Sequence, residues 1–190
     1  EKSLNTGAIF VAERVGQDRF LKYLQRFGFG QKAEIDFPGE VAGDISNLDA
    51  GRSVDYATAS FGQGIAVTPL QIAMAIGAIA NRGILMTPYL VERIRDEAGV
   101  EELHRPAERG GVISASNAEA LTKMLVSAVR NGFENRAGIS GYFVAGKTGT
   151  AQIALPGGGG YYDDRFLHSF FGYFPAYDPQ FLVFFYIELT

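Results

Sequence analysis

Three strand-like segments at the C-terminal end of the sequence most constrain the fold. Residues 142–154, 168–175 and 181–189 are rich in aromatic and β-branched side chains. Consecutive segments of this kind, joined by loops, are typical of an antiparallel meander. Because the last segment is almost wholly apolar, we expect it to be a central, buried strand. The sequence therefore predicts a sheet that other elements must cover.

The connection between the first two segments is rich in glycine and polar residues. Pro156 precedes four consecutive glycines, and residues 161–165 are expected to form a polar tip. A glycine-rich loop cradles phosphate when a capped helix follows it, and none is expected here. We therefore predict a mobile hairpin loop without a ligand.

Most of the remaining regular structure is predicted to be helical. We expect helices near residues 6–15, 17–27, 70–81 and 117–131, where apolar residues recur at three- and four-residue steps. Thr68 and Pro69 suit the N-cap and first turn of the third helix, which is apolar all round and so predicted to be buried. Ser114 or Ser116 would cap the fourth helix. Helices and strands in separate runs indicate an α+β fold.

Two regions are expected to hold little regular structure. Residues 31–57 contain short apolar patches among glycine, proline and asparagine, which predicts an irregular excursion. Residues 84–95 have short strand character, and residues 96–111 are polar and predicted to form a hairpin or loop.

Composition and charge exclude several functional classes. A chain of 190 residues, 47% apolar and 20% charged, is about one globular domain. The net charge of −4 and the absence of a basic run argue against nucleic acid as a partner. The chain has no cysteine, and neither His104 nor His168 has metal-ligand spacing, so we expect no metal and interpret both as surface or structural histidines. No apolar run reaches about 18 residues, so no membrane span is expected.

The first strand ends in a cluster of residues suited to chemistry. Alternation along a strand puts Lys147 and Gly149 on one face and Thr148 and Thr150 on the other. Glycine allows another backbone to approach, and lysine supplies a compact positive charge. This pattern favours a groove for a backbone-like acyl substrate that carries negative charge. The alternative is an ordinary strand with a polar end, because short motifs recur by chance.

Further motifs carry a resemblance to a known family. Lys147-Thr-Gly149, continued by Thr150-Ala-Gln152, matches the K-T-G motif, and Ser3-Leu-Asn5 matches S-x-N. Supporting stretches lie at 56–64, 67–73, 79–83 and 169–176. The sequence thus resembles the transpeptidase domain of penicillin-binding proteins, most like the class B cell-division or elongation type. The resemblance implies an antiparallel sheet packed with helices, as in serine β-lactamases and penicillin-binding proteins.

One motif of the family is missing. No Ser-x-x-Lys occurs in the 190 residues, although in the family this motif supplies the nucleophilic serine and its activating lysine. The resemblance therefore implies that residues 1–190 are the C-terminal part of the domain, incomplete at both ends. Two walls of an active site would be present without the nucleophile, and the rest of the domain would be a required partner.

The resemblance implies a peptidoglycan D,D-transpeptidase that cross-links stem peptides through an acyl-serine intermediate. β-Lactams, which mimic the D-Ala-D-Ala end of the stem, would acylate the same serine. Among catalytic residues, Lys147 would provide the electrostatic field, Ser3 would relay a proton to the leaving amine, and the N–H of Thr150 would donate to the oxyanion. No cofactor is implied.

The same resemblance implies a set of substrate-binding residues. Asn5 would bind the amide side chain of the donor, and the hydroxyls of Thr148 and Thr150 would hold the terminal carboxylate. Gly149 and Gln152 complete the set. For Ser3 and Asn5, a helix N-cap and a turn residue are the alternative roles.

Two other functions remain open. A serine β-lactamase or a D,D-carboxypeptidase shares the motifs, although Thr150-Ala-Gln152 and residues 60–64 favour the class B transpeptidase. A non-catalytic binding fragment is supported by the missing nucleophile. The resemblance places the parent protein on the extracytoplasmic face of the membrane, anchored through an N-terminal segment that this sequence lacks.

Overall fold

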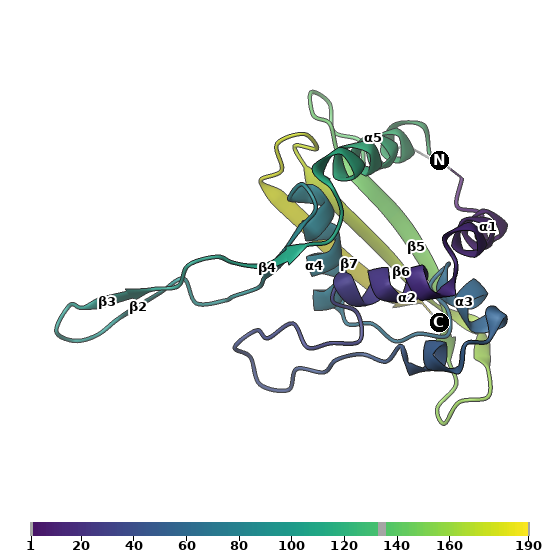
Figure 1. The fold of residues 1–190 in the computed structure, drawn as a ribbon. Coiled ribbons are helices and arrows are strands. Elements are labelled where there is room, and N and C mark those ends of the chain that lie inside the picture. Colours follow the sequence, from purple (N-terminus) through teal and green to yellow (C-terminus); the bar gives the residue numbers. More distant parts are fainter. Residues whose placement is uncertain (1, 133–135, 190) are drawn as a thin grey trace.

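The computed structural model describes residues 2–132 and 136–189. It places helices beside one three-stranded antiparallel sheet, with a long two-stranded arm projecting from the body (Figure 1). The helices are α1 (Asn5–Val15), α2 (Gln17–Arg26), α3 (Ser53–Ala59), α4 (Pro69–Ala80) and α5 (Ala115–Asn131), with a short 3-10 helix η1 (Ser46–Ala50). The predicted α+β class is confirmed.

The predicted meander is present, with different boundaries. The sheet has the order β5 (Ala145–Ala154), β6 (Tyr161–Phe174), β7 (Phe181–Leu189), and both pairings are antiparallel. Residues 161–165 are not a polar tip. They begin β6, where Tyr161 pairs with Ala154 and Arg165 forms an ion pair with Glu188. Asp163 and Asp164, which are neighbours on opposite faces of this part of β6, are both exposed.

The expectation that residues 181–189 form a central, buried strand is wrong for the described chain. β7 is an edge strand of the sheet, and only Leu182 and Phe184 among its residues are half-buried. These two lie on the face that α4 contacts, whereas Phe185 and Ile187 are exposed. Most apolar side chains of β7 are therefore not covered by other parts of the described chain.

Helix α4 is buried as predicted, and side-chain hydrogen bonds fix its N-terminus. Thr68 and Gln71 form a capping box, in which each side chain bonds to the other residue's backbone N–H. Gln71 is only 2% exposed. Its Nε2 donates to three carbonyl oxygens, those of Gly28 (3.3 Å), Gln31 (2.8 Å) and Ala42 (2.6 Å). One side chain therefore holds the start of α4 against two distant loops.

Helix α5 covers the first strand of the sheet. Ser114 is its N-cap and accepts a hydrogen bond from the N–H of Asn117. The buried cluster between the two elements contains Val126, Ala145, Tyr173 and Ala176. Because Ala145 opens β5, this packing fixes the strand that carries the K-T-G motif.

The two regions expected to be irregular contain more structure than predicted. η1 and α3 lie within residues 31–59, held by Tyr56, whose hydroxyl donates to the carbonyl of Leu48 (3.0 Å) and whose ring meets the edge of Phe20. Further along the chain, β1 (Ile84–Thr87) pairs with β4 (Ala107–Gly111). Between them β2 (Arg93–Arg95) and β3 (Glu101–Leu103) pair to form the projecting arm (Figure 1). Residues 96–111, expected to form a hairpin or loop, thus contain the turn and second strand of one hairpin and the strand β4.

No helix within residues 2–132 and 136–189 has the length and apolar character needed to cross a membrane.

Candidate active site

The K-T-G motif lies on an edge strand. Burial alternates along β5: Lys147 and Gly149 are half-buried, and Thr148 and Thr150 are exposed. This confirms the predicted division of the motif between two faces. Within the described residues β5 pairs only with β6, so its other edge is free to accept hydrogen bonds from a further extended chain.

Lys147 is partly withdrawn from solvent. Its Nζ donates to the carbonyl oxygen of Thr148 at 3.0 Å, and no carboxylate pairs with it in the part of the chain that the structure describes. Burial lowers the pKa of the Lys147 amine below the usual lysine value. An amine without a paired carboxylate retains its field for an incoming anion.

The glycines of the motif allow β5 and β6 to approach closely. A Cβ at Gly146 would lie 2.7 Å from the carbonyl oxygen of Phe171, and a Cβ at Gly149 would lie 2.6 Å from the Ser169 hydroxyl. Both distances are shorter than van der Waals contact. Gly146 and Gly149 are therefore needed for the close packing of β5 against β6, in addition to the room that a glycine leaves for a substrate backbone.

His168 is a candidate site residue that the sequence interpretation missed. It lies directly opposite Thr150 in the β5–β6 register, and its Nδ1 is 3.3 Å from the Thr150 hydroxyl oxygen. His168 is half-buried, whereas Thr150 is exposed. The sequence contains no local signal for this pair, because the register of two long strands brings the residues together. The other histidine, His104, stacks on Tyr89 in the arm.

Ser3 and Asn5 lie at the start of α1, and both are exposed. The alternative role of N-cap is wrong for Ser3, because Leu4 occupies the N-cap position without a side-chain cap. Within the described residues neither side chain bonds to β5, so the structure does not bring them into contact with Lys147.

Helix α1 is connected to the sheet through α3 and the turn that follows α3. Helix α1 packs against α3, and the turn at residues 60–64 follows α3. The N–H of Gly64 donates to the hydroxyl of Tyr161 at 3.1 Å, and Tyr161 pairs with Ala154 at the end of β5. The S-x-N and K-T-G segments thus belong to one packed unit.

Gln152 is exposed on β5, on the same face as Thr148 and Thr150. Its Nε2 is 3.5 Å from the carbonyl oxygen of Tyr162. This contact is at the limit of a hydrogen bond, so the amide is available to another partner.

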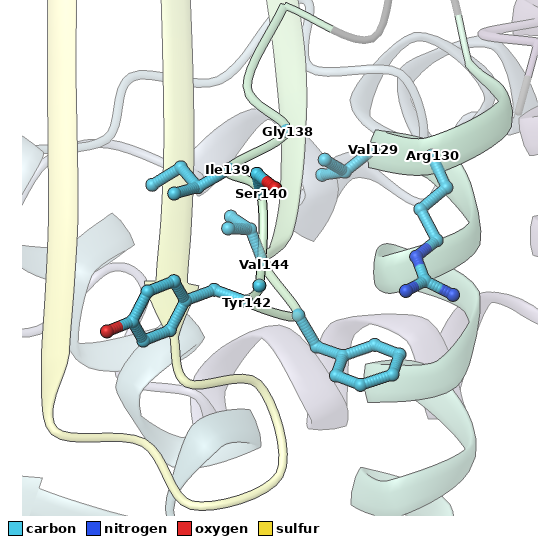
Figure 2. Close-up of a pocket in the computed structure, with 9 residues that line it drawn as sticks. Val129, Arg130, Gly138, Ile139, Ser140, Tyr142 and Val144 are labelled. Atoms are coloured by element: carbon cyan, nitrogen blue, oxygen red, sulfur yellow. The ribbon is translucent and has the colours of Figure 1, made fainter.

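A separate pocket of about 510 Å³ lies before the start of β5. Figure 2 shows Val129 and Arg130 of α5 on one side and the segment with Ile139, Ser140 and Val144 on the other. The Arg130 guanidinium lies 4.2 Å from the ring centre of Phe143. None of the predicted site residues lines this pocket, so the cavity is distinct from the K-T-G strand.

No group of three or more His, Asp or Glu side chains in the described ranges is arranged to hold a metal ion. The groups gathered on β5 are instead one amine, two exposed hydroxyls and a free strand edge. Such a set suits the binding of a peptide that ends in a carboxylate.

Comparison with known proteins agrees with this geometry. Residues 1–189 match the family described as the penicillin binding protein transpeptidase domain. The chain belongs to this family. It is 37% identical over 186 residues to the stage V sporulation protein D of Bacillus subtilis, a match that covers 97% of this chain and 28% of that protein. It is 36% identical over 190 residues to the penicillin-binding protein PbpB of Mycolicibacterium smegmatis, covering 96% of this chain and 29% of that protein.

Solved penicillin-binding proteins share the fold. The apo form of penicillin-binding protein 3 from Mycobacterium tuberculosis has a TM-score of 0.91 and 32% identity, over 98% of this chain and 44% of that one. The same protein complexed with aztreonam has a TM-score of 0.90 and 33% identity, over 97% and 43% of the two chains. The class B type expected from the sequence is confirmed by these relatives. The chain spans less than a third of the length of the curated relatives described above.

Proposed function

We propose that residues 1–190 form the C-terminal part of the active-site domain of a peptidoglycan D,D-transpeptidase. The free edge of β5, with half-buried Lys147 next to the exposed hydroxyls of Thr148 and Thr150, carries this proposal. The nucleophilic serine and its activating lysine lie outside this sequence, in the rest of the domain. We therefore expect this chain to need the rest of the domain as a partner.

The donor stem peptide would lie along β5 as an added strand. Backbone hydrogen bonds give such a peptide affinity, and the side chains beside it give specificity. The terminal carboxylate of D-Ala-D-Ala would meet the hydroxyls of Thr148 and Thr150 within the field of Lys147. Asn5 and Gln152 would bind donor amide groups, and Gly149 would let the donor backbone approach.

The chemistry would proceed as two acyl transfers. The serine Oγ attacks the carbonyl carbon of the penultimate D-Ala, and the resulting oxyanion accepts a hydrogen bond from the Thr150 N–H. The activating lysine takes the proton of the attacking serine, and Ser3 relays it to the nitrogen of the departing D-Ala within the electrostatic field of Lys147. An amine of a neighbouring stem then attacks the ester, forms the cross-link and releases the serine.

β-Lactam antibiotics would bind the same groove. A β-lactam presents a carboxylate and a strained amide, and opening of that ring on the serine leaves a stable ester. The structures of the M. tuberculosis penicillin-binding protein 3 with aztreonam and with ampicillin support this expectation by similarity. The full-length protein would act on the extracytoplasmic face of the membrane, because peptidoglycan is assembled there.

The experiment that tests the proposal measures both products of the reaction. The full-length protein is given a stem pentapeptide as donor and an amine acceptor, and released D-Ala and joined product are quantified. We expect release of D-Ala with joined product, and loss of both with Lys147→Ala. Release of D-Ala with only the shortened peptide would indicate a carboxypeptidase. No turnover, with β-lactam bound reversibly, would indicate a non-catalytic binding protein.

A further inference from the structure

We infer that His168 is a positioning residue that directs the hydroxyl proton of Thr150 toward the carboxylate of the bound substrate. The inference rests on the proposed function, because it concerns how Thr150 holds the donor or a β-lactam. It adds a residue of β6 to a site otherwise built from β5 and the start of α1.

The pairing of β5 with β6 places the side chains of Thr150 and His168 next to each other. Thr150 and His168 are directly opposite each other in the β5–β6 register and therefore project from the same face of the sheet. The Thr150 Oγ1 lies 3.3 Å from His168 Nδ1, within reach of a hydrogen bond. On the other side of His168 lies Ile187 of β7, directly opposite in the β6–β7 register. The imidazole thus has a polar neighbour on β5 and an apolar one on β7.

The number of protons on Thr150 and His168 determines which of the two donates the hydrogen bond between them when substrate is bound. A threonine hydroxyl has one proton and two lone pairs, and each ring nitrogen of a neutral histidine either donates or accepts. If Nδ1 accepts, the only proton of Thr150 points at the ring and cannot meet a carboxylate. If Nδ1 carries the proton and donates, Thr150 keeps its own proton for the anion. Carboxylate binding therefore selects the Nδ1–H form of His168.

The placement of His168 separates this role from proton transfer in the reaction. Lys147 lies on the opposite face of β5 from Thr150, so His168 does not share the face of the lysine amine. Its ring also lies beside Phe166, at 6.4 Å between ring centres. His168 reaches the substrate only through the hydroxyl of Thr150.

Two substitutions of His168 distinguish the hydrogen bond from the ring itself. His168→Phe keeps an aromatic ring and removes the donor, whereas His168→Asn places an amide N–H near the position of Nδ1. Losing the direction of one neutral hydrogen bond weakens binding by about threefold to tenfold. We expect His168→Phe to raise the penicillin concentration for half-maximal acylation by about this factor, with the limiting acylation rate little changed. His168→Asn restores most of the affinity.

The decisive experiment is a double-mutant cycle in the full-length protein, with acylation by benzylpenicillin followed over a range of concentrations. Thr150→Val removes the hydroxyl and keeps the branched shape. Because His168 acts through that hydroxyl, His168→Phe should have no further effect on half-maximal concentration in the Thr150→Val background. Melting temperatures of all variants establish that each is folded. If His168→Phe does not fold, the affinity of His168→Asn for benzylpenicillin is the measurement that tests the role of His168.

Each alternative result has a distinct meaning. An equal loss of affinity from His168→Phe in both backgrounds overturns the positioning role, and so does a loss confined to the limiting rate. A failure of His168→Asn to restore affinity also contradicts it. If benzylpenicillin does not acylate even the wild-type protein, the proposed function fails, and the role of His168 fails with it.

Discussion

The hydroxyl of Tyr173 lies 2.7 Å from the hydroxyl of Thr122, in the packed interface between β6 and α5. Tyr173 is 0% exposed and Thr122 is 6% exposed. The Thr122 hydroxyl also donates to the carbonyl oxygen of Ala118 at 2.9 Å. Because this uses its only proton, Tyr173 must be the donor to Thr122. Burial raises the pKa of Tyr173, which keeps the phenol protonated in this role.

Removing the hydrogen bond between Tyr173 and Thr122 should destabilise the packing of α5 on the sheet. Tyr173→Phe leaves one acceptor site of Thr122 unpaired and should lower the free energy of unfolding by about 1 kcal/mol. Urea unfolding of the full-length protein measures the change. Tyr23→Phe is the matched control, because Tyr23 is exposed on α2. Equal stability of Tyr173→Phe and the control would show that the buried bond contributes nothing.

Gln71 should be among the most sensitive polar residues in the fold. Gln71→Leu leaves three carbonyl oxygens without their donor, as well as the backbone N–H of Thr68, which bonds to the Gln71 side chain at 2.9 Å. We expect a loss of about 3 kcal/mol, because each unpaired buried group is costly. Gln25→Leu on the exposed face of α2 should change stability by less than about 0.5 kcal/mol. A similar small effect for both variants would contradict the buried network.

The two glycines of β5 should respond differently to alanine. Gly146→Ala drives a methyl group into the backbone carbonyl of Phe171, so the strands must separate. We expect a loss of stability of about 1–3 kcal/mol. Gly149→Ala meets only the hydroxyl of Ser169, which can rotate, and should cost less. Thermal unfolding of the two variants gives the comparison, and the reverse order would contradict the register of β5 and β6.

The lowered pKa of Lys147 makes its contribution to stability depend on pH. The pKa is lowered by burial in the folded protein, so the folded state releases the proton at a lower pH than the unfolded state. Between the lowered value and the usual lysine pKa of about 10.4, the unfolded state binds more protons. The contribution of Lys147 to the free energy of unfolding therefore rises as pH increases through this window.

Chemical unfolding of the wild-type protein and of Lys147→Met tests this dependence. The difference in stability, wild type minus variant, should increase as the pH rises toward the usual lysine pKa of about 10.4. A difference that stays constant over this range would show that Lys147 is solvated like a surface lysine.

The sequence allowed prediction of the elements that have strong periodic signals. Helix α4 followed from Thr68, Pro69 and an apolar run, because local capping and packing agree there. The start of β6 was missed because Asp163 and Asp164 suggest a loop. In the structure they lie in a ribbon solvated on both faces, where alternation carries no signal. Helix α3 was missed because seven residues are too few for a period, and tertiary contacts of Tyr56 stabilise it.

The candidate site shows the same limit. Local motifs identified the residues of β5 and the start of α1, and the alternation of Lys147 and Thr148 followed from strand geometry. The pairing of Thr150 with His168 depends on a long-range register that no short motif encodes. The position of β7 was mispredicted because hydrophobicity indicates which face must be covered, and not which residues cover it.

The most direct test of the proposed function is intact-mass and peptide-mass analysis of the full-length protein after reaction with benzylpenicillin. We expect one covalent adduct, on a serine outside residues 1–190 that is followed three residues later by lysine. We also expect Lys147→Ala to slow the formation of this adduct. An adduct on Ser3 or on any other residue of this chain, or no adduct on the folded wild-type protein, would overturn the proposed function.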